Sequence, residues 1–213
     1  MGWTNDNLMS LQSHVLAEER HYPEASGDFT WILSAISLAS KTIANKVRQA
    51  RIEDVLGDHG TGNVQGEQQQ KLDVIANEVI KACLGSRANI GALVSEEEET
   101  PTILRSHADG GRYAVLFDPL DGSSNLDVGV GVGTIFSILR LGRGVKGTPE
   151  DMILASESRQ VAAGYVLYGS STVFVLTTGR GVDMFVLDQG IGAFVLVQKD
   201  LRIPDANRVY SIN

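Results

Sequence analysis

Residues 112–125, RYAVLFDPLDGSSN, start as an apolar run and end in acidic and small side chains. The run before Asp118 is short and bounded by polar residues, which predicts a β-strand. The Pro, Asp and Gly that follow it are typical of a turn. A turn alone does not require two carboxylates, Asp118 and Asp121, nor a Gly-Ser-Ser whose backbone amides are left uncrowded. The stretch therefore predicts a strand whose end carries a binding or catalytic site.

Similar short apolar runs, bounded by Gly, Asp or Ser, recur after residue 90 and predict further strands. They span residues 90–99, 133–142, 160–179, 182–188 and 193–200. Before residue 90 the periodicity predicts helices, one within the first 20 residues and two more at 29–50 and 71–85. Asp28 is the expected N-cap of the second helix, and Gly85 the expected C-cap of the third. This order predicts the α+β class, a layered fold with N-terminal helices packed on a mostly antiparallel sheet.

The composition is that of an ordinary globular chain, with 213 residues, 43% of them hydrophobic and 21% charged. The net charge is -8, and Lys and Arg are scattered rather than striped, so nucleic-acid binding is not expected. Cys83 is the only cysteine, which excludes an internal disulfide and favours a reducing compartment. Neither a signal peptide nor a membrane helix is expected, since a membrane helix needs about 18 apolar residues. The end at RVYSIN, in strand-like sequence, suggests a piece of a longer protein.

A second acidic cluster, Glu96–Glu99, follows another predicted strand. If this strand and the strand before Asp118 are neighbours, Glu96 or Glu97 and both aspartates converge at one edge of the sheet. Carboxylates held together repel one another unless cations lie between them. Oxygen ligands of this kind suit Mg²⁺ or Mn²⁺, shared with a substrate phosphate, and the Leu120 carbonyl could complete the shell.

The residues after the second aspartate could hold the phosphate itself. Gly122, Ser123 and Ser124 supply backbone N–H groups, and a helix that starts there would turn its N-terminus toward an anion. Asp73, at the start of a predicted helix, and Glu67, in a glycine-rich loop, could orient an attacking water. Taken singly, each feature is typical of a turn, a solvated loop or a helix cap. Their combination favours metal-assisted phosphoryl transfer.

Other site motifs are incomplete. GVGVGTIF at 129–136 does not contain Gly-x-Gly-x-x-Gly, and GDHGTGN at 57–63 lacks the Lys-Ser/Thr of a phosphate-binding loop. The four histidines, at positions 14, 21, 59 and 107, show no metal spacing and are expected on the surface. These features therefore do not predict a dinucleotide, nucleoside triphosphate or histidine-ligated metal site.

The motifs resemble those of the fructose-1,6-bisphosphatases, which belong to the lithium-sensitive, magnesium-dependent sugar phosphatases. The matching segments are GNVQGEQQQKLDVIANE, VSEEEE, FDPLDGSSN, GTIFSI, VAAGYVLYGSS and VYSIN. Asn125 after Ser-Ser favours this family over the inositol monophosphatases, and NVQGE with SEEE is closer to its plastid-type members. The resemblance covers only about the first two-thirds of a member. It implies that residues 1–213 are the N-terminal domain with the metal and regulatory sites, without the C-terminal sugar-binding domain.

The resemblance implies hydrolysis of the 1-phosphate of fructose 1,6-bisphosphate to fructose 6-phosphate and phosphate, in gluconeogenesis or the Calvin cycle. It also implies a Mg²⁺ cofactor, with Mn²⁺ or Zn²⁺ as alternatives, a homotetramer without membrane partners, and a cytoplasmic or plastid-stromal location. The implied metal ligands are Glu96, Glu97, Asp118, Asp121 and the Leu120 carbonyl. The implied catalytic acids are Asp73, Glu97 and Glu67. The implied substrate-binding residues are Asp121, Gly122, Ser123, Ser124 and Asn213.

Family members regulated by AMP bind it near the N-terminus, and several residues here match that site. They are Gly27, Asp28, Thr30, Arg112, Tyr113 and Arg140. A capped helix with ordinary surface arginines explains the same residues, so the sequence leaves both interpretations open. The cysteine-bearing insertion of plastid members is missing from residues 142–159, which excludes a thiol switch there.

Two other functions stay open alongside the hydrolase. One is a non-catalytic truncated homologue that acts as a regulatory or assembly partner. The other keeps the chemistry but acts on sedoheptulose bisphosphate or an inositol phosphate. If the chain is truncated, we expect it to be inactive or nearly so by itself.

Overall fold

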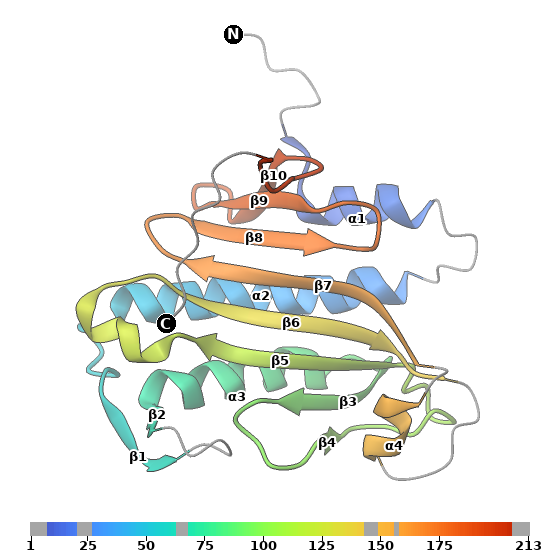
Figure 1. The fold of residues 1–213 in the computed structure, drawn as a ribbon, viewed down its shortest axis with the longest axis horizontal. Coiled ribbons are helices and arrows are strands. Elements are labelled where there is room, and N and C mark those ends of the chain that lie inside the picture. Colours follow the sequence, from blue (N-terminus) through green and yellow to red (C-terminus); the bar gives the residue numbers. More distant parts are fainter. Residues whose placement is uncertain (1–7, 21–26, 63–67, 143–148, 156–157, 206–213) are drawn as a thin grey trace, which may run out of the picture.

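The computed structural model describes residues 8–20, 27–62, 68–142, 149–155 and 158–205 (Figure 1). The helices are α1 (Leu11–Glu19), α2 (Asp28–Gln49), α3 (Lys71–Gly85), the 3-10 helix η2 (Ser123–Val128) and α4 (Pro149–Leu154). The strands are β1 (Asp58–Gly62), β2 (Gln68–Gln70), β3 (Ile90–Ser95), β4 (Thr102–Ile103), β5 (Tyr113–Asp121), β6 (Val132–Arg140), β7 (Arg159–Tyr168), β8 (Thr172–Thr177), β9 (Asp183–Asp188) and β10 (Ala193–Gln198). Glu67 and Asn213, two residues expected at the site, lie outside the described residues.

In the described part of the chain, eight strands form one sheet in the order β10-β9-β8-β7-β6-β5-β3-β4. Strands β3 and β5 pair in parallel, and the other neighbours pair antiparallel. Strands β1 and β2 form a separate antiparallel pair, within the segment whose glycines predict a loop. The mostly antiparallel sheet with helices from the N-terminal half confirms the predicted α+β class.

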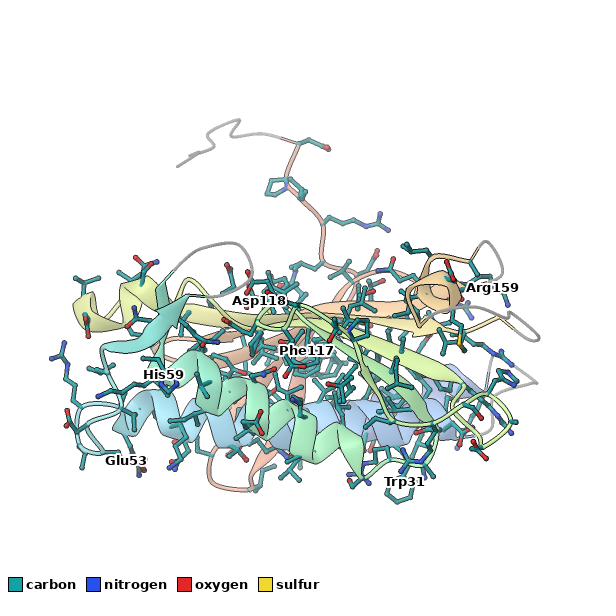
Figure 2. The ribbon with its side chains drawn as sticks, turned by 90° about the horizontal axis from the view of Figure 1, so that it is seen from below. Trp31, Glu53, His59, Phe117, Asp118 and Arg159 are labelled. Carbon is teal, nitrogen blue, oxygen red and sulfur yellow. The ribbon has the colours of Figure 1, made fainter. Side chains whose placement is uncertain are left out.

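Helices α2 and α3 cover one face of the sheet, and Figure 2 shows both ribbons beneath the strands. The apolar residues Ile32, Ile36 and Ile43 of α2 recur along one side of the helix and are almost fully buried. Along β6, Phe136 and Ile138 are buried toward the helices, because alternate side chains of a strand point to the same face. Each such buried side chain stabilises the fold by roughly 1.5–3 kcal/mol. The main core therefore lies between this sheet face and the helices.

The opposite face of the sheet is covered by α4 near β5, where Met152 and Ile153 pack against a small buried cluster of Ala92, Ala114 and Leu141. Farther along the same face, four large apolar side chains remain 43–52% exposed among the described residues. We call this surface the open face, and it consists of Ile135, Tyr165, Leu167 and Val197. Ile135 lies opposite Tyr165 in the ladder, so the exposed side chains of β6 and β7 are neighbours, whereas Val197 lies on β10, beyond β8 and β9.

Some local predictions were wrong. Helix α2 begins at Asp28 itself, because Gly27 is the N-cap and adopts a φ of 75°, which glycine tolerates. Gly85 is the last residue of α3 rather than its cap. His14 is buried, and its Nε2 lies 2.9 Å from Asp183 Oδ2, because α1 packs against the β9–β10 edge of the sheet. Periodicity could not show this contact between distant parts of the chain.

Candidate metal and phosphate site

The two acidic segments follow neighbouring parallel strands. Ser95 lies opposite Phe117, and the Glu96 N–H donates to the Phe117 carbonyl at 3.0 Å. Glu96 and Asp118 are therefore the next residues at the same end of the two strands. In Figure 2 Phe117 lies between the sheet and the helices, whereas Asp118 lies toward the other side of the sheet. The two acidic segments are therefore adjacent, as the predicted convergence of their carboxylates requires.

The Asp118-Pro-Leu-Asp121 segment is an irregularity within β5, not the chain-reversing turn that its composition predicts. The register between β5 and β6 shifts between Asp118 and Asp121. Pro119 has no N–H to donate to a ladder, which is why proline in strands occurs at such bulges. The Leu120 N–H instead donates to Asp118 Oδ1 at 3.0 Å. A bulge re-aims the side chains beside it, and here those side chains are the two aspartates.

Buried hydroxyl groups on the helix side of the sheet hydrogen-bond to this bulge. Thr134 Oγ1 donates to the Pro119 carbonyl at 2.8 Å and lies 2.8 Å from the Tyr168 hydroxyl. Burial raises the pKa of Tyr168, whose hydroxyl also hydrogen-bonds to Ser40 of α2. All three hydroxyl-bearing residues are almost fully buried. The bulge is therefore connected to the helix layer through polar groups that solvent does not reach.

The start of α3 supplies a third acid to the same place. Asp73 is buried, and its Oδ2 accepts hydrogen bonds from the Gln70 N–H at 2.7 Å and from Ser123 Oγ at 3.1 Å. Gln69 Nε2 donates to Glu97 Oε2 at 2.7 Å. The residues around the start of α3 thus contact both Glu97 after β3 and Ser123 after β5.

Burial and neighbouring charges raise the pKa of two acids of this cluster, Glu97 and Asp118. Burial, followed by the charges of Asp73, Glu96 and Asp118, raises the pKa of Glu97 to about 7, although the Gln69 hydrogen bond opposes the shift. Burial also raises the pKa of Asp118 to about 6, with Glu96, Asp121 and Asp73 adding to the effect. Such shifts require that the carboxylates lie near one another in a partly desolvated place.

The donor set fits a hard divalent cation. Among the described residues, no group of three or more acidic, histidine or cysteine side chains is arranged so that it could hold a metal ion by itself. Mg²⁺ does not need such a cage, because it usually keeps several waters and takes one or two carboxylates plus substrate phosphate oxygens. An open group of partly buried carboxylates that repel one another matches that requirement.

The raised pKa values predict how the stability of the metal-free chain depends on pH. The folded state holds protons on Glu97 and Asp118 that the unfolded chain has released, so this contribution to stability falls as pH rises from about 4.5 to about 7. The variant Glu97→Gln lacks one of these charges, so its unfolding temperature should rise relative to wild type across that range. Thermal unfolding without metal at pH 5 and pH 8 measures the difference. Equal pH dependence of Glu97→Gln and the exposed control Glu99→Gln would contradict this prediction.

The proposed phosphate side of the site is less regular than the sequence predicts. Gly122 has a φ of 76° and leads into the 3-10 helix η2 rather than into an α-helix. Ser123 is half-buried through its contact with Asp73, whereas Ser124 is exposed. Of these two serines, Ser124 is therefore the more accessible to solvent.

The residues of the possible AMP site are divided between neighbouring hollows. Tyr113 and Arg140, opposite each other on β5 and β6, line a cavity of about 400 Å³ together with Glu19 and Phe29. Arg112 lines adjacent hollows, and its Nη1 lies 3.3 Å from Asp28 Oδ2. Gly27 and Thr30 do not line this cavity, and the Thr30 N–H donates to Glu19 Oε1 at 3.3 Å. The Glu19 carboxylate therefore already accepts a hydrogen bond from one of the backbone N–H groups at the start of α2.

Sequence reasoning missed several residues that support the acids. Gln69, Thr134 and Tyr168 have no signal of their own in the sequence, since their partners are distant in the chain. Glu98 differs, because it belongs to a run of four acids of which only Glu96 and Glu97 were predicted to be site residues.

A layered α+β fold with a cluster of carboxylates after two adjacent strands places the chain in a defined class of proteins. A sequence-family model described as "Fructose-1-6-bisphosphatase, N-terminal domain" matches residues 9–199. The chain belongs to the fructose-1,6-bisphosphatase family.

Individual relatives agree with this assignment. The chain is 44% identical over 207 residues to a cytosolic fructose-1,6-bisphosphatase of Brassica napus, covering 97% of this chain and 60% of the relative. It is 48% identical over 206 residues to a class 1 fructose-1,6-bisphosphatase of Persephonella marina, covering 96% and 62%. The holo form of the Leishmania major fructose-1,6-bisphosphatase superposes with a TM-score of 0.86 at 38% identity, covering 97% and 63%. The chain thus spans about 60% of the length of these curated relatives.

Proposed function

We propose that this chain carries the metal site of an enzyme that hydrolyses the 1-phosphate of fructose 1,6-bisphosphate to fructose 6-phosphate and phosphate. The observation that carries the proposal is the group of acids after β3 and β5, where burial and then the charges of neighbouring acids raise the pKa of Glu97 and Asp118. Membership of the fructose-1,6-bisphosphatase family supports the choice of substrate. The chain is then the N-terminal domain of such an enzyme.

Each group of residues has a proposed role. The cation, Mg²⁺ with Mn²⁺ or Zn²⁺ as alternatives, would be held by Glu96, Glu97, Asp118, Asp121 and the Leu120 carbonyl. The 1-phosphate is held by Gly122, Ser123 and Ser124. Glu67 and Asn213, outside the described residues, are proposed to complete the acidic site and to contact the 6-phosphate.

The chemistry is an in-line displacement at phosphorus. When bound, the divalent cation neutralises charge on the transferred phosphoryl group. Asp73 and Glu97 orient the attacking water and accept its proton as the new oxygen–phosphorus bond forms. The bond from phosphorus to the sugar oxygen breaks, and the sugar oxygen leaves as a hydroxyl after taking a proton from solvent water. In the metal-free chain burial raises the pKa of Glu97 to about 7, and a bound cation would lower it again by favouring the ionised carboxylate. Asp73 reaches Ser123 directly, so the water and the phosphate are positioned by connected residues.

Phosphate release from fructose 1,6-bisphosphate, with and without Mg²⁺, tests the proposal. We expect release that depends on Mg²⁺ from the longest polypeptide that carries this sequence, and little or none from the 213-residue chain alone. Sedoheptulose bisphosphate and an inositol phosphate, assayed in parallel, test the substrate. A longer polypeptide that binds no divalent cation and releases no phosphate would instead identify a non-catalytic homologue.

We further propose that the cavity beside Tyr113 and Arg140 binds AMP. Its apolar wall at Phe29 offers a surface for a base, and Arg140 and Arg159 offer positive charge for a phosphate. Glu19 already accepts from the amide of Thr30, so a phosphate at the start of α2 has to displace this carboxylate. A family-typical homotetramer and a cytoplasmic location complete the proposal. Among the described residues, no helix has both the length and the apolarity needed to cross a bilayer.

The AMP proposal predicts a selective effect of Arg140. AMP at millimolar concentration should raise the unfolding temperature of the wild-type chain, since a ligand that binds only the folded state stabilises it. Arg140→Ala should remove most of this shift, because it removes a cation that lines the cavity. Arg180→Ala, an exposed arginine outside the cavity, is the control and should keep the shift. An AMP-induced shift that is the same in all three proteins would refute the assignment.

A further inference from the structure

The four consecutive glutamates after β3 have different surroundings. The Glu96 N–H bonds to β5 through the Phe117 carbonyl, and Glu97 accepts from Gln69. Glu99 is exposed. Glu98 turns away from the cluster toward α3 and β4, where both of its carboxylate oxygens are hydrogen-bonded.

Glu98 is held by three donors from two elements. Its Oε1 accepts from Asn77 Nδ2 at 3.0 Å and from Lys81 Nζ, both on α3. Its Oε2 accepts from Thr102 Oγ1 of β4 at 3.0 Å. All three bonds are charge-assisted because the acceptor is the Glu98 carboxylate, and the bond from Lys81 also joins two opposite charges. With both oxygens engaged in this way, Glu98 is an anchor of the loop and not a further ligand for a cation.

The same side of α3 reaches both the anchor and the reactive acids. Asp73, Asn77 and Lys81 are four residues apart, so they lie along one face of the helix. Asp73 is near enough for its charge to act on Glu97, while Asn77 and Lys81 bind Glu98. Glu97 therefore lies in the chain between two residues that are held in place. The Glu96 N–H bonds to β5, and the Glu98 carboxylate bonds to α3.

We propose that Glu98 is a positioning residue that holds the Glu97 carboxylate in the acidic cluster. The inference rests on the proposed function, since it concerns the cation that Glu96, Glu97 and the aspartates would bind. Partners that orient metal ligands typically account for about 10- to 100-fold in metal affinity when they are removed. The run of four glutamates thus divides into two ligands, one anchor and one exposed residue.

A simple electrostatic alternative gives opposite results for two variants. If Glu98 acted only through its negative charge, Glu98→Gln would weaken cation binding and Lys81→Met would strengthen it, because Lys81 is positive. If Glu98 acts by anchoring the loop, both variants weaken binding. The Lys81–Glu98 pair is about one-quarter exposed on each side, so a large loss of overall stability is not expected.

The test is titration of Mn²⁺ by calorimetry into the full polypeptide that carries this sequence, with thermal unfolding of each metal-free variant. We expect Glu98→Gln and Lys81→Met each to weaken Mn²⁺ binding about 10-fold or more. We also expect the double variant to be little worse than either single one, because the two residues share one interaction. Glu99→Gln, with the same loss of charge, and Glu78→Gln, which removes the other partner of Lys81, should change the affinity less than about 2-fold.

The outcomes separate this inference from the proposed function. Stronger Mn²⁺ binding by Lys81→Met, or equal effects of Glu98→Gln and Glu99→Gln, would overturn the anchoring role while leaving the metal site intact. A wild-type protein that binds no Mn²⁺ would overturn the metal site, and the role of Glu98 with it. If Glu98→Gln fails to fold, Lys81→Met decides the matter, since the sign of its effect is sufficient.

Discussion

Replacing Asp118 by asparagine is expected to stabilise the metal-free chain and, in the same protein, to abolish Mn²⁺ binding. Burial and the charges of Glu96, Asp121 and Asp73 raise the pKa of Asp118 to about 6, so its ionised form is disfavoured in the folded state at neutral pH. The neutral amide removes this repulsion without changing the shape of the side chain. It also removes a proposed ligand, and with it part of the charge neutralisation on which phosphoryl transfer depends. Hydrolysis should fall at least about 1000-fold, because several kcal/mol of such stabilisation corresponds to about tenfold for every 1.4 kcal/mol.

The matched control is Asp127→Asn, the same chemical change at an exposed aspartate of η2. It should alter neither the unfolding temperature at pH 8 nor the Mn²⁺ affinity. Thermal unfolding and calorimetry on the three proteins give both quantities. An Asp118→Asn protein that is less stable than wild type and still binds Mn²⁺ would show that Asp118 is structural.

A gain in stability with a loss of binding is the mark of a group kept for function. Carboxylates that repel one another cost stability, so a chain selected for stability alone would not gather them in a partly buried place. The bulge at Pro119 adds to this, since it interrupts the β5–β6 register at the same point. The hydroxyl groups of Thr134 and Tyr168 then hold the interrupted strand in place.

The sequence predicts those features of the site that depend on local pattern. Strand β5 and the acids around Asp118 follow from an apolar run that ends in Asp-Pro-Leu-Asp, and the α+β class follows from the order of helical and strand patterns. The irregularity at Pro119 was misjudged as a turn, because a turn and a bulge use the same residues. Whether β5 continues through it depends on pairing with β6, which is 11 residues or more distant in the chain.

The sequence pattern could not predict contacts between segments that are distant in the chain. His14 was expected at the surface, because an isolated histidine gives no sign that Asp183 will pair with it. Glu98 could have been recognised only if α3 was known to lie beside the loop after β3, so that Asn77 and Lys81 could reach it. Spacing along one helix shows which residues share a face, but not which element that face meets.

The exposed apolar side chains of the open face predict that another layer packs on this side of the sheet. Ile135, Tyr165, Leu167 and Val197 are each 43–52% exposed, and apolar surface of this kind marks a place where something else packs. The relatives that the chain matches are longer, since it spans about 60% of their length. We expect the chain alone to bind a hydrophobic dye and to self-associate, and the longest polypeptide that carries this sequence to do neither.

Leu167→Lys should then have opposite effects in the two lengths of polypeptide. In the 213-residue chain it should reduce dye binding and self-association, because it places a charge on an exposed apolar surface. In the longer polypeptide it should lower stability, because the charge would be buried without a partner. Ile203→Lys, at a residue that is 93% exposed and outside the sheet, should have little effect in either. Light scattering, dye fluorescence and thermal unfolding measure these changes, and a neutral Leu167→Lys in the longer polypeptide would mean that nothing covers this face.

The same face connects packing to activity. Ile135 lies directly opposite Asp118 in the β5–β6 ladder, so a layer that covers Ile135 also closes over the acidic cluster. Closure excludes water and strengthens the electrostatic interactions within a site. Phosphate release by the chain alone should therefore be at least about 100-fold slower than by the longer polypeptide, a loss of roughly 3 kcal/mol in transition-state stabilisation. Equal rates from the two lengths would mean that the acids after β3 and β5 need no covering layer to work.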